Sequence, residues 1–174
     1  MSGRLTGKRV CILAENQFED IELLYPLHRF REEGAQVVVI GPEKTRYTGK
    51  HGCTVDADLA AAEGATHEFD AVIVPGGYAP DHMRRNRDLL EIVRRADGAG
   101  HPVAAICHAA WVLISARVVQ GRRMTCFWSI RDDVINAGGE YVDEPVVIDG
   151  HLITSRYPPD LGDFCRAIIE ASED

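Results

Sequence analysis

The chain lacks the apolar segments that membrane-spanning and secreted proteins carry. Across its 174 residues, no apolar run approaches the roughly 20 residues that a transmembrane helix needs. Residues 1–9 (MSGRLTGKR) also lack the apolar core of a secretory signal peptide. We therefore expect a cytoplasmic protein with no membrane partner.

Positive charge is also scarce. The chain has 19 Lys and Arg residues against 27 Asp and Glu residues, which gives a formal net charge of -8. This balance disfavours nucleic acid as a partner, because its phosphates would be repelled. The five cysteines are odd in number and include no C-x-x-C pair, so they indicate neither a disulfide framework nor a zinc site. We expect no metal and no other cofactor.

What the chain does have is enough apolar sequence for a sizeable core, at 45% hydrophobic residues. Short apolar segments alternate with amphipathic ones, which is typical of a mostly parallel sheet with helices on both faces. The expected strands cover 10–14, 37–40, 71–74 and 103–106, the expected helices cover 21–30, 89–95, 130–137 and 159–170, and hairpins or loops are expected at 41–52 and 146–154. With no repeat and no linker, we predict a single α/β domain over 1–174.

Residues 103–113 (VAAICHAAWVL) carry the most specific signal. A buried strand leads directly to Cys107, and a helix of small and apolar residues follows. This is the layout of the nucleophile elbow of hydrolases, in which small neighbours allow a strained turn. A helix that begins after the sulfur also favours the thiolate. We therefore predict that Cys107 is reactive, with a buried structural cysteine as the alternative.

Two further loops are expected beside Cys107. In an open parallel sheet, ligands bind at the carboxyl ends of the strands, so the loops just after each strand meet there. The first strand is followed by 15–20 (ENQFED) and the third by 75–81 (PGGYAPD). Together these loops would bring an acid, a glycine turn and a thiol to one edge, which is what a cysteine hydrolase needs.

The motifs in this order resemble the PfpI family of intracellular cysteine proteases. They are Phe-Glu-Asp after the first strand, Pro-Gly-Gly after the third, Ala-Ile-Cys-His at the elbow, and the segments 130–138 (IRDDVINAG) and 154–156 (TSR). That family shares a superfamily with the Parkinson's-disease protein deglycase and the class I glutamine amidotransferases. The resemblance spans about residues 8–170 and implies a three-layer, flavodoxin-like sandwich with a nucleophile elbow.

The resemblance implies roles for four side chains. Cys107 would be the nucleophile and His108 its base or orienting imidazole. Glu19 would lie against the sulfur as a protonated carboxyl, although a helix-capping acid is the alternative. Asp81 stands where the family commonly has Glu and would orient the histidine of a neighbouring subunit. Because Asp is shorter, this weakens a protease assignment, and a solvated acid at a helix start is an equal alternative for Asp81.

The same resemblance implies the surroundings of the sulfur. The N–H groups of Gly77 and His108 would form an oxyanion hole, which stabilises charge on a carbonyl oxygen. Gly76, Tyr78 and Trp128 would line the pocket. An ordinary tight turn at the glycines, and a core or subunit contact for the aromatics, are the alternatives.

The function implied is a cysteine-dependent hydrolase that acts on carbonyl compounds. Relatives are described as proteases, as glutathione-independent glyoxalases and as protein deglycases in stress responses, so the substrate would be a small aldehyde, a peptide or a glycated protein. The resemblance also implies a homodimer or a hexamer.

One alternative to a hydrolase is a redox or stress sensor that uses oxidation of Cys107. A glutamine amidotransferase is disfavoured, because residues 155–159 (SRYPP) lack the His-x-Glu pair of those enzymes.

Overall fold

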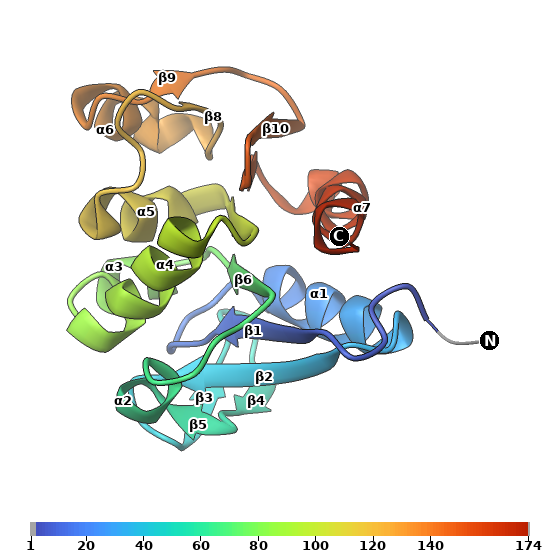
Figure 1. Cartoon of the computed structure of the whole chain (residues 1–174). Helices are drawn as coiled ribbons and strands as arrows, with labels where there is room; N and C mark the ends of the chain where they lie inside the picture. The colour runs from blue at the N-terminus through green and yellow to red at the C-terminus, as the bar shows by residue number, and fades with distance from the viewer. Residues whose placement is uncertain (1–2, 174) are drawn as a thin grey trace.

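A central sheet of seven strands organises the protein, whose computed structural model describes residues 3–173 (Figure 1). The strand order is β10-β11-β7-β6-β1-β2-β5. Neighbouring strands run parallel except β10 and β11, which form an antiparallel hairpin. The strands are β1 (Arg9–Leu13), β2 (Gln36–Gly41), β5 (Leu59–Ala60), β6 (Ala71–Val74), β7 (Val103–Ile106), β10 (Val146–Asp149) and β11 (Leu152–Ser155).

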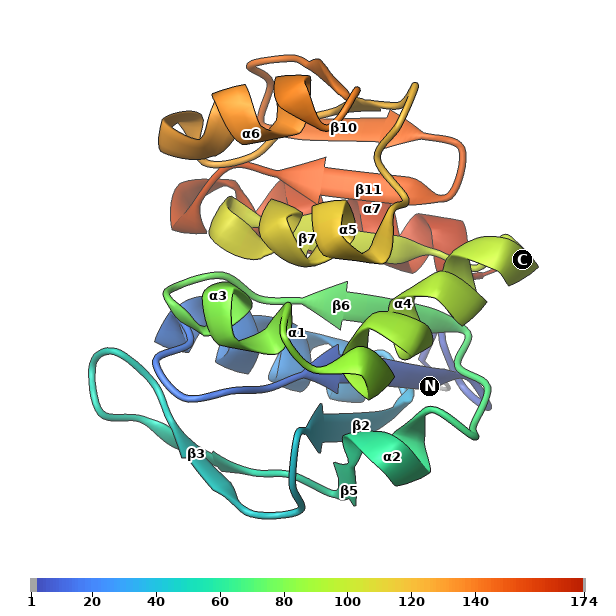
Figure 2. The same ribbon diagram turned by 90° about the vertical axis from the view of Figure 1, so that its left-hand side faces the viewer.

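Helices cover both faces of this sheet. They are α1 (Asp20–Glu32), α2 (Ala61–Gly64), α3 (Ala79–Met83), α4 (Arg87–Ala99), α5 (Ala110–Ala116), α6 (Arg131–Asn136) and α7 (Leu161–Ser172). The helices α1 and α7 contact each other on one face, whereas α2 to α5 pack together on the other (Figures 1 and 2). The predicted three-layer α/β sandwich is therefore confirmed. The prediction of a single domain over 1–174 stays a prediction.

The inner strands are apolar without interruption because both of their faces are covered by helices. Every residue of β6 and β7 is buried. The parallel register pairs Val74 with Ala105, so these strands end at a common edge. The loops that follow them, including the one that begins at Cys107, therefore meet there.

The helix α4 shows how local signals set an element. It begins after Asn86, whose side-chain oxygen accepts hydrogen bonds from the N–H groups of Asp88 and Leu89, both at 3.0 Å. It ends at Gly100, whose φ of +76° is the left-handed conformation that glycine adopts without strain. The sequence predicted this helix at 89–95, and its caps extend it in both directions.

Two small two-stranded sheets lie outside the main sheet. The strands β3 (Arg46–Thr48) and β4 (Thr54–Asp56) are antiparallel, and β8 (Arg123–Met124) pairs in parallel with β9 (Glu140–Tyr141). A loop or hairpin was predicted at 41–52. The hairpin formed by β3 and β4 begins and ends later in the chain, with its turn at 49–53. The strands β5, β8 and β9 and the helices α2 and α3 were not predicted, since two to five residues are too few to show a period.

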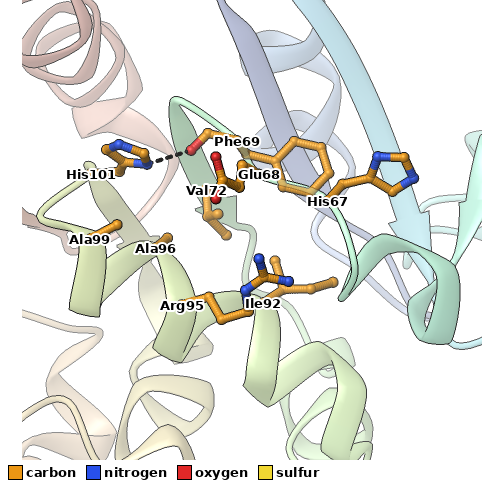
Figure 3. A pocket seen from close by; sticks show the side chains of 9 residues that line it. All are labelled: His67, Glu68, Phe69, Val72, Ile92, Arg95, Ala96, Ala99 and His101. Carbon is orange, nitrogen blue, oxygen red and sulfur yellow. Dashed lines mark hydrogen bonds between the residues drawn. The ribbon is translucent and has the colours of Figure 1, made fainter.

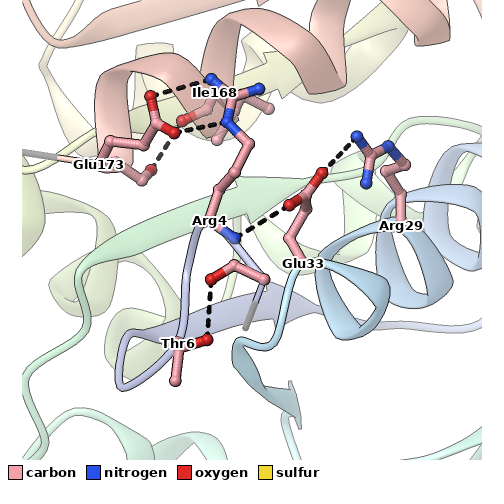
Figure 4. A network of polar contacts seen from close by, with 8 residues as sticks. Arg4, Thr6, Arg29, Glu33, Ile168 and Glu173 are labelled. Carbon is pink, nitrogen blue, oxygen red and sulfur yellow. Dashed lines mark hydrogen bonds and ion pairs between the residues drawn. The ribbon is translucent and has the colours of Figure 1, made fainter. Parts of the chain in front are cut away.

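The two ends of the described chain are tied together (Figure 4). The guanidinium of Arg4 pairs with Glu173 beyond α7, and its backbone N–H donates to Glu33 at 3.1 Å. Arg29 also binds Glu33, at 2.6 Å. Arg29 and Glu33 lie at the C-terminal end of α1, far from Asp20, where the helix begins. The network therefore anchors the ends of the chain without touching the edge that carries Cys107.

Candidate active site

Cys107 occupies a strained turn at the carboxyl end of β7. Its φ of +63° is left-handed, which is rare for a residue with a side chain. A 3-10 turn, Cys107–Ala109, follows at once and leads into α5. The neighbouring Gly76 must be small, because a Cβ there would lie 2.7 Å from the Cβ of Cys107. The predicted strained turn between a strand and a helix is therefore present, and the role of Cys107 as a nucleophile stays a prediction.

The imidazole of His108 is held beside the sulfur. Its Nδ1 lies 3.3 Å from the Cys107 Sγ, and its ring stacks on Phe127 with 5.2 Å between centroids. Its Nε2 lies 3.4 Å from the hydroxyl oxygen of Ser129. Burial lowers the pKa of His108, and the charge of Lys50 lowers it further. The ring is therefore neutral at pH 7 and can accept a proton from the thiol.

The carboxyl group against the sulfur belongs to Glu22 and not, as the sequence predicted, to Glu19. Glu22 is fully buried, and its Oε2 accepts a hydrogen bond from the N–H of Gly76 at 2.8 Å. Its side chain reaches Cys107. Glu19 instead turns toward the β3–β4 hairpin, where its carboxylate lies 2.9 Å from the Lys50 Nζ. The correction has a simple cause: Glu19 precedes the first turn of α1, whereas Glu22 lies within it and faces the sheet edge.

The ionisation of Glu22 follows from its burial, which raises its pKa to about 8 although the Gly76 N–H opposes this. In residues 3–173 its Oε1 has no hydrogen-bond partner. A buried carboxylate oxygen without a donor is costly, whereas a neutral carboxyl tolerates the site. Glu22 is therefore protonated at pH 7.

The thiol of Cys107 is harder to ionise than the sequence predicted. Burial raises its pKa to about 12, and an ionised Glu22 contributes to the increase. The N–H groups of Gly77 and His108 and the charge of Lys50 act in the opposite direction. The expected lowering by a helix start is outweighed because only 9% of Cys107 is exposed to solvent. At pH 7 the Glu22 repulsion is absent, since that carboxyl is neutral.

Two backbone donors point toward the sulfur, and they are the pair that the sequence singled out, Gly77 and His108. Gly77 has a φ of +82°, and a Cβ there would lie 2.4 Å from the backbone nitrogen of Glu19. A glycine is therefore required to bring this N–H to the site. Two N–H groups beside a nucleophile are suited to hold a negative oxygen.

A cavity of about 250 Å³ lies over the sulfur. Its lining residues are Glu19, Glu22, Lys50, Gly77, Tyr78, Cys107, His108, Phe127, Tyr157 and Pro158. Tyr78 thus lines the predicted pocket, whereas Gly76 does not line the cavity and instead packs against Cys107 and Glu22. Trp128 lines an adjacent cavity that shares Tyr157 with this one.

Asp81 lies apart from the other predicted site residues. It is exposed in the first turn of α3 and does not line the cavity. Within residues 3–173, the group beside the His108 Nε2 is the Ser129 hydroxyl. A role for Asp81 therefore depends on a neighbouring subunit and stays a prediction.

Sequence reasoning missed Glu22, Lys50, Phe127 and Tyr157. Glu22 was a candidate, because it follows Glu19 by three residues, but that spacing alone does not decide which of the two faces the sulfur. Lys50 comes from a hairpin turn that no motif marks.

A second cavity of about 250 Å³ opens at the opposite edge of the sheet (Figure 3). It is lined by His67, Glu68, Phe69, Val72, Ile92, Arg95, Ala96, Ala99 and His101. The ring of His101 donates through Nδ1 to the carbonyl of Phe69 at 2.8 Å. This cavity is lined by no cysteine, so the chemistry of the thiol belongs to the first cavity.

Comparison with known proteins agrees with the geometry. The model of the DJ-1/PfpI family matches residues 8–171. A deglycase of Pyrococcus abyssi is 48% identical over 162 residues, which cover 93% of this chain and 98% of that protein. Deglycase PfpI of Pyrococcus furiosus is 46% identical with the same coverage. The crystal structure of Drosophila melanogaster DJ-1beta is 28% identical and superposes with a TM-score of 0.90, covering 100% of this chain and 92% of that one.

Among residues 3–173, no helix is long and apolar enough to cross a membrane. The comparisons and the sheet topology agree on one assignment: the chain belongs to the DJ-1/PfpI family.

Proposed function

We propose that this protein is a deglycase-type enzyme in which the sulfur of Cys107 attacks the carbonyl carbon of a reactive aldehyde or of its adduct with protein. The observation that carries the proposal is the His108 Nδ1, 3.3 Å from a sulfur that sits on a strained elbow. Close relatives that are named deglycases support the reaction class.

The attack can be written so that every proton is accounted for. A bond forms between the sulfur and the carbonyl carbon while the thiol proton passes to the His108 Nδ1. The π electrons move to the carbonyl oxygen, which the N–H groups of Gly77 and His108 stabilise. Return of the proton from His108 to that oxygen gives a neutral hemithioacetal. No cofactor is needed for this step.

Glu22 acts in this scheme as a positioning residue. Protonated at pH 7, it places a neutral O–H group near the sulfur instead of a repelling charge, and that group favours the developing thiolate. Within residues 3–173 of one chain, Ser129 rather than an acid lies at the His108 Nε2, which favours carbonyl addition over peptide cleavage. Amide hydrolysis would need an acid that orients the imidazole and stabilises its positive charge until the imidazole protonates the leaving amine.

The test is the turnover of methylglyoxal, and of a peptide carrying its adduct, by Cys107→Ser. We expect at least a hundredfold loss with the fold unchanged by circular dichroism, because the hydroxyl is a far weaker nucleophile. Cys53→Ser is the matched control, since Cys53 is an exposed thiol outside the cavity. Undiminished turnover in Cys107→Ser would overturn the assignment. Absence of turnover in the wild type, with ready oxidation of Cys107, would favour the redox sensor instead.

A further inference from the structure

Lys50 is the one cationic side chain that lines the Cys107 cavity within residues 3–173. Its ammonium lies 2.9 Å from the Glu19 carboxylate and 5.1 Å from the centre of the Tyr78 ring. The side chain is 29% exposed, so it is reachable from the cavity. A positive charge beside a nucleophile is suited to hold an anionic group of the reacting molecule.

The backbone of Lys50 is fixed. Its N–H donates to the carbonyl of Phe18 at 2.9 Å, which ties the hairpin turn to the loop after β1. Just after it in the chain, the N–H groups of His51 and Cys53 donate to the Asp20 carboxylate at 2.9 and 2.8 Å. Asp20 is itself buried at the start of α1. The ammonium is therefore presented from a rigid turn, as a preorganised binding group requires.

The hydrogen-bonding capacity of Lys50 is only partly used. An ammonium carries three N–H donors, and within residues 3–173 Glu19 is its one hydrogen-bond acceptor. Two donors remain for a ligand, and a carboxylate is the small group that accepts such charge-assisted bonds best. The ammonium also lies over the face of the Tyr78 ring, which lines the same cavity.

We propose that Lys50 forms a carboxylate subsite, so that the cavity binds the 2-hydroxy carboxylate products of 2-oxo aldehydes. This inference rests on the function proposed above. Methylglyoxal and one water together have the composition of lactic acid: the aldehyde carbon is oxidised by two electrons and the ketone carbon is reduced by two. No external oxidant or reductant is required. Transfer of the hydrogen on the sulfur-bound carbon to the ketone carbon leaves a thioester. Attack of water on this thioester breaks the C–S bond, restores the thiol and forms the carboxylate at that carbon, within the cavity that Lys50 lines.

The test is protection of Cys107 from iodoacetamide by glycolate, read by peptide mass at pH 7. We expect glycolate to slow alkylation saturably, whereas glycolamide, which has the same shape without the charge, gives no protection. In Lys50→Met the glycolate concentration for half protection should rise about tenfold or more, because a charge-assisted bond is lost. Lys50→Arg should retain most of the protection. Lys44→Met is the matched control, since Lys44 is exposed outside the cavity.

Each rate is compared with that of the same variant without glycolate, which removes any effect of Lys50 on the sulfur itself. Equal protection in wild type and Lys50→Met, or none in the wild type, would overturn the subsite. This readout needs no turnover. Turnover of methylglyoxal without Lys50-dependent protection would overturn the subsite and leave the proposed function standing. Protection without turnover would overturn the proposed function and leave the subsite standing.

Discussion

At the scale of single residues, one buried neighbourhood holds the thiol of Cys107, the carboxyl of Glu22 and the imidazole of His108. Burial alone would leave a thiol inert. The neighbourhood offsets this with a neutral carboxyl, two backbone N–H groups and a neutral imidazole 3.3 Å from the sulfur. We therefore expect the reactivity proposed for Cys107 to depend on the proton of Glu22 as much as on the thiol itself.

That proton should be visible in the stability of the protein. The folded pKa of Glu22, about 8, lies above the ordinary value of 4.5. The folded state therefore binds more protons than the unfolded state between these values, and stability falls as the pH rises through this window. Glu22→Gln should be more stable than the wild type by roughly 1–3 kcal/mol at pH 7, and by less at pH 5. Urea denaturation at both pH values measures this.

Glu32→Gln serves as the control, because Glu32 is exposed at the far end of the same helix. It should change stability little and equally at both pH values. A Glu22→Gln variant that is less stable than the wild type at pH 7 would show that the native carboxyl is ionised.

At the scale of elements, the site is an assembly of loop ends presented by a rigid sheet. The strand β7 supplies Cys107, the loop after β6 supplies Gly77, and the start of α1 supplies Glu22. Their convergence was predictable, because uninterrupted apolar strands reveal a parallel sheet and its carboxyl edge. The sequence could not predict which carboxyl faces the sulfur, because Glu19 and Glu22 lie within one helical turn. The exact first residue of α1 decides between them.

The β3–β4 hairpin joins this assembly through Asp20, and sequence reasoning could not foresee it. The turn at 49–53 has no apolar period and no chemical motif. Its place is set by two backbone N–H groups that bind the Asp20 carboxylate, and only the three-dimensional structure brings these groups together. Lys50 reaches the cavity for the same reason.

Asp20→Ala should therefore loosen the hairpin. Two part-buried hydrogen bonds to a charged carboxylate are lost, which costs about 1–3 kcal/mol of folding free energy. The pKa of Asp20 lies below its ordinary value, because the N–H groups of His51 and Cys53 outweigh the effect of burial. Its contribution to stability is thus present above the unfolded pKa and is lost as the pH falls through the folded one. Amide hydrogen exchange should become faster at residues 49–53. Unchanged exchange there would show that Asp20 does not hold the hairpin turn in place.

At the scale of the whole molecule, neither Asp81 nor Trp128 is packed into the interior of residues 3–173. Trp128 is 65% exposed and Asp81 is exposed on α3. The sequence pattern of one chain carries no information about where a second chain binds. The residues that would complete the site across an interface are therefore the least predictable from the sequence. The predicted homodimer or hexamer would give both side chains a contact.

Light scattering at micromolar concentration tests this shared site. We expect a mass of at least twice the 19.2 kDa of one chain. If Asp81 orients a neighbouring His108, then Asp81→Asn should lower turnover about tenfold without dissociating the oligomer. A wild-type monomer that retains full turnover would leave Asp81 as a solvated surface acid.

The central claim is that the sulfur of Cys107 adds to a carbonyl carbon. The most direct measurement is the alkylation rate of each cysteine by iodoacetamide at pH 7, read by peptide mass with and without methylglyoxal. The account predicts that Cys107 is labelled in the folded protein and that methylglyoxal slows this at the concentration that half-saturates turnover, whereas labelling of Cys53 is unaffected at that concentration. Labelling of Cys107 that does not respond to methylglyoxal, or its absence in the folded protein, would contradict the claim.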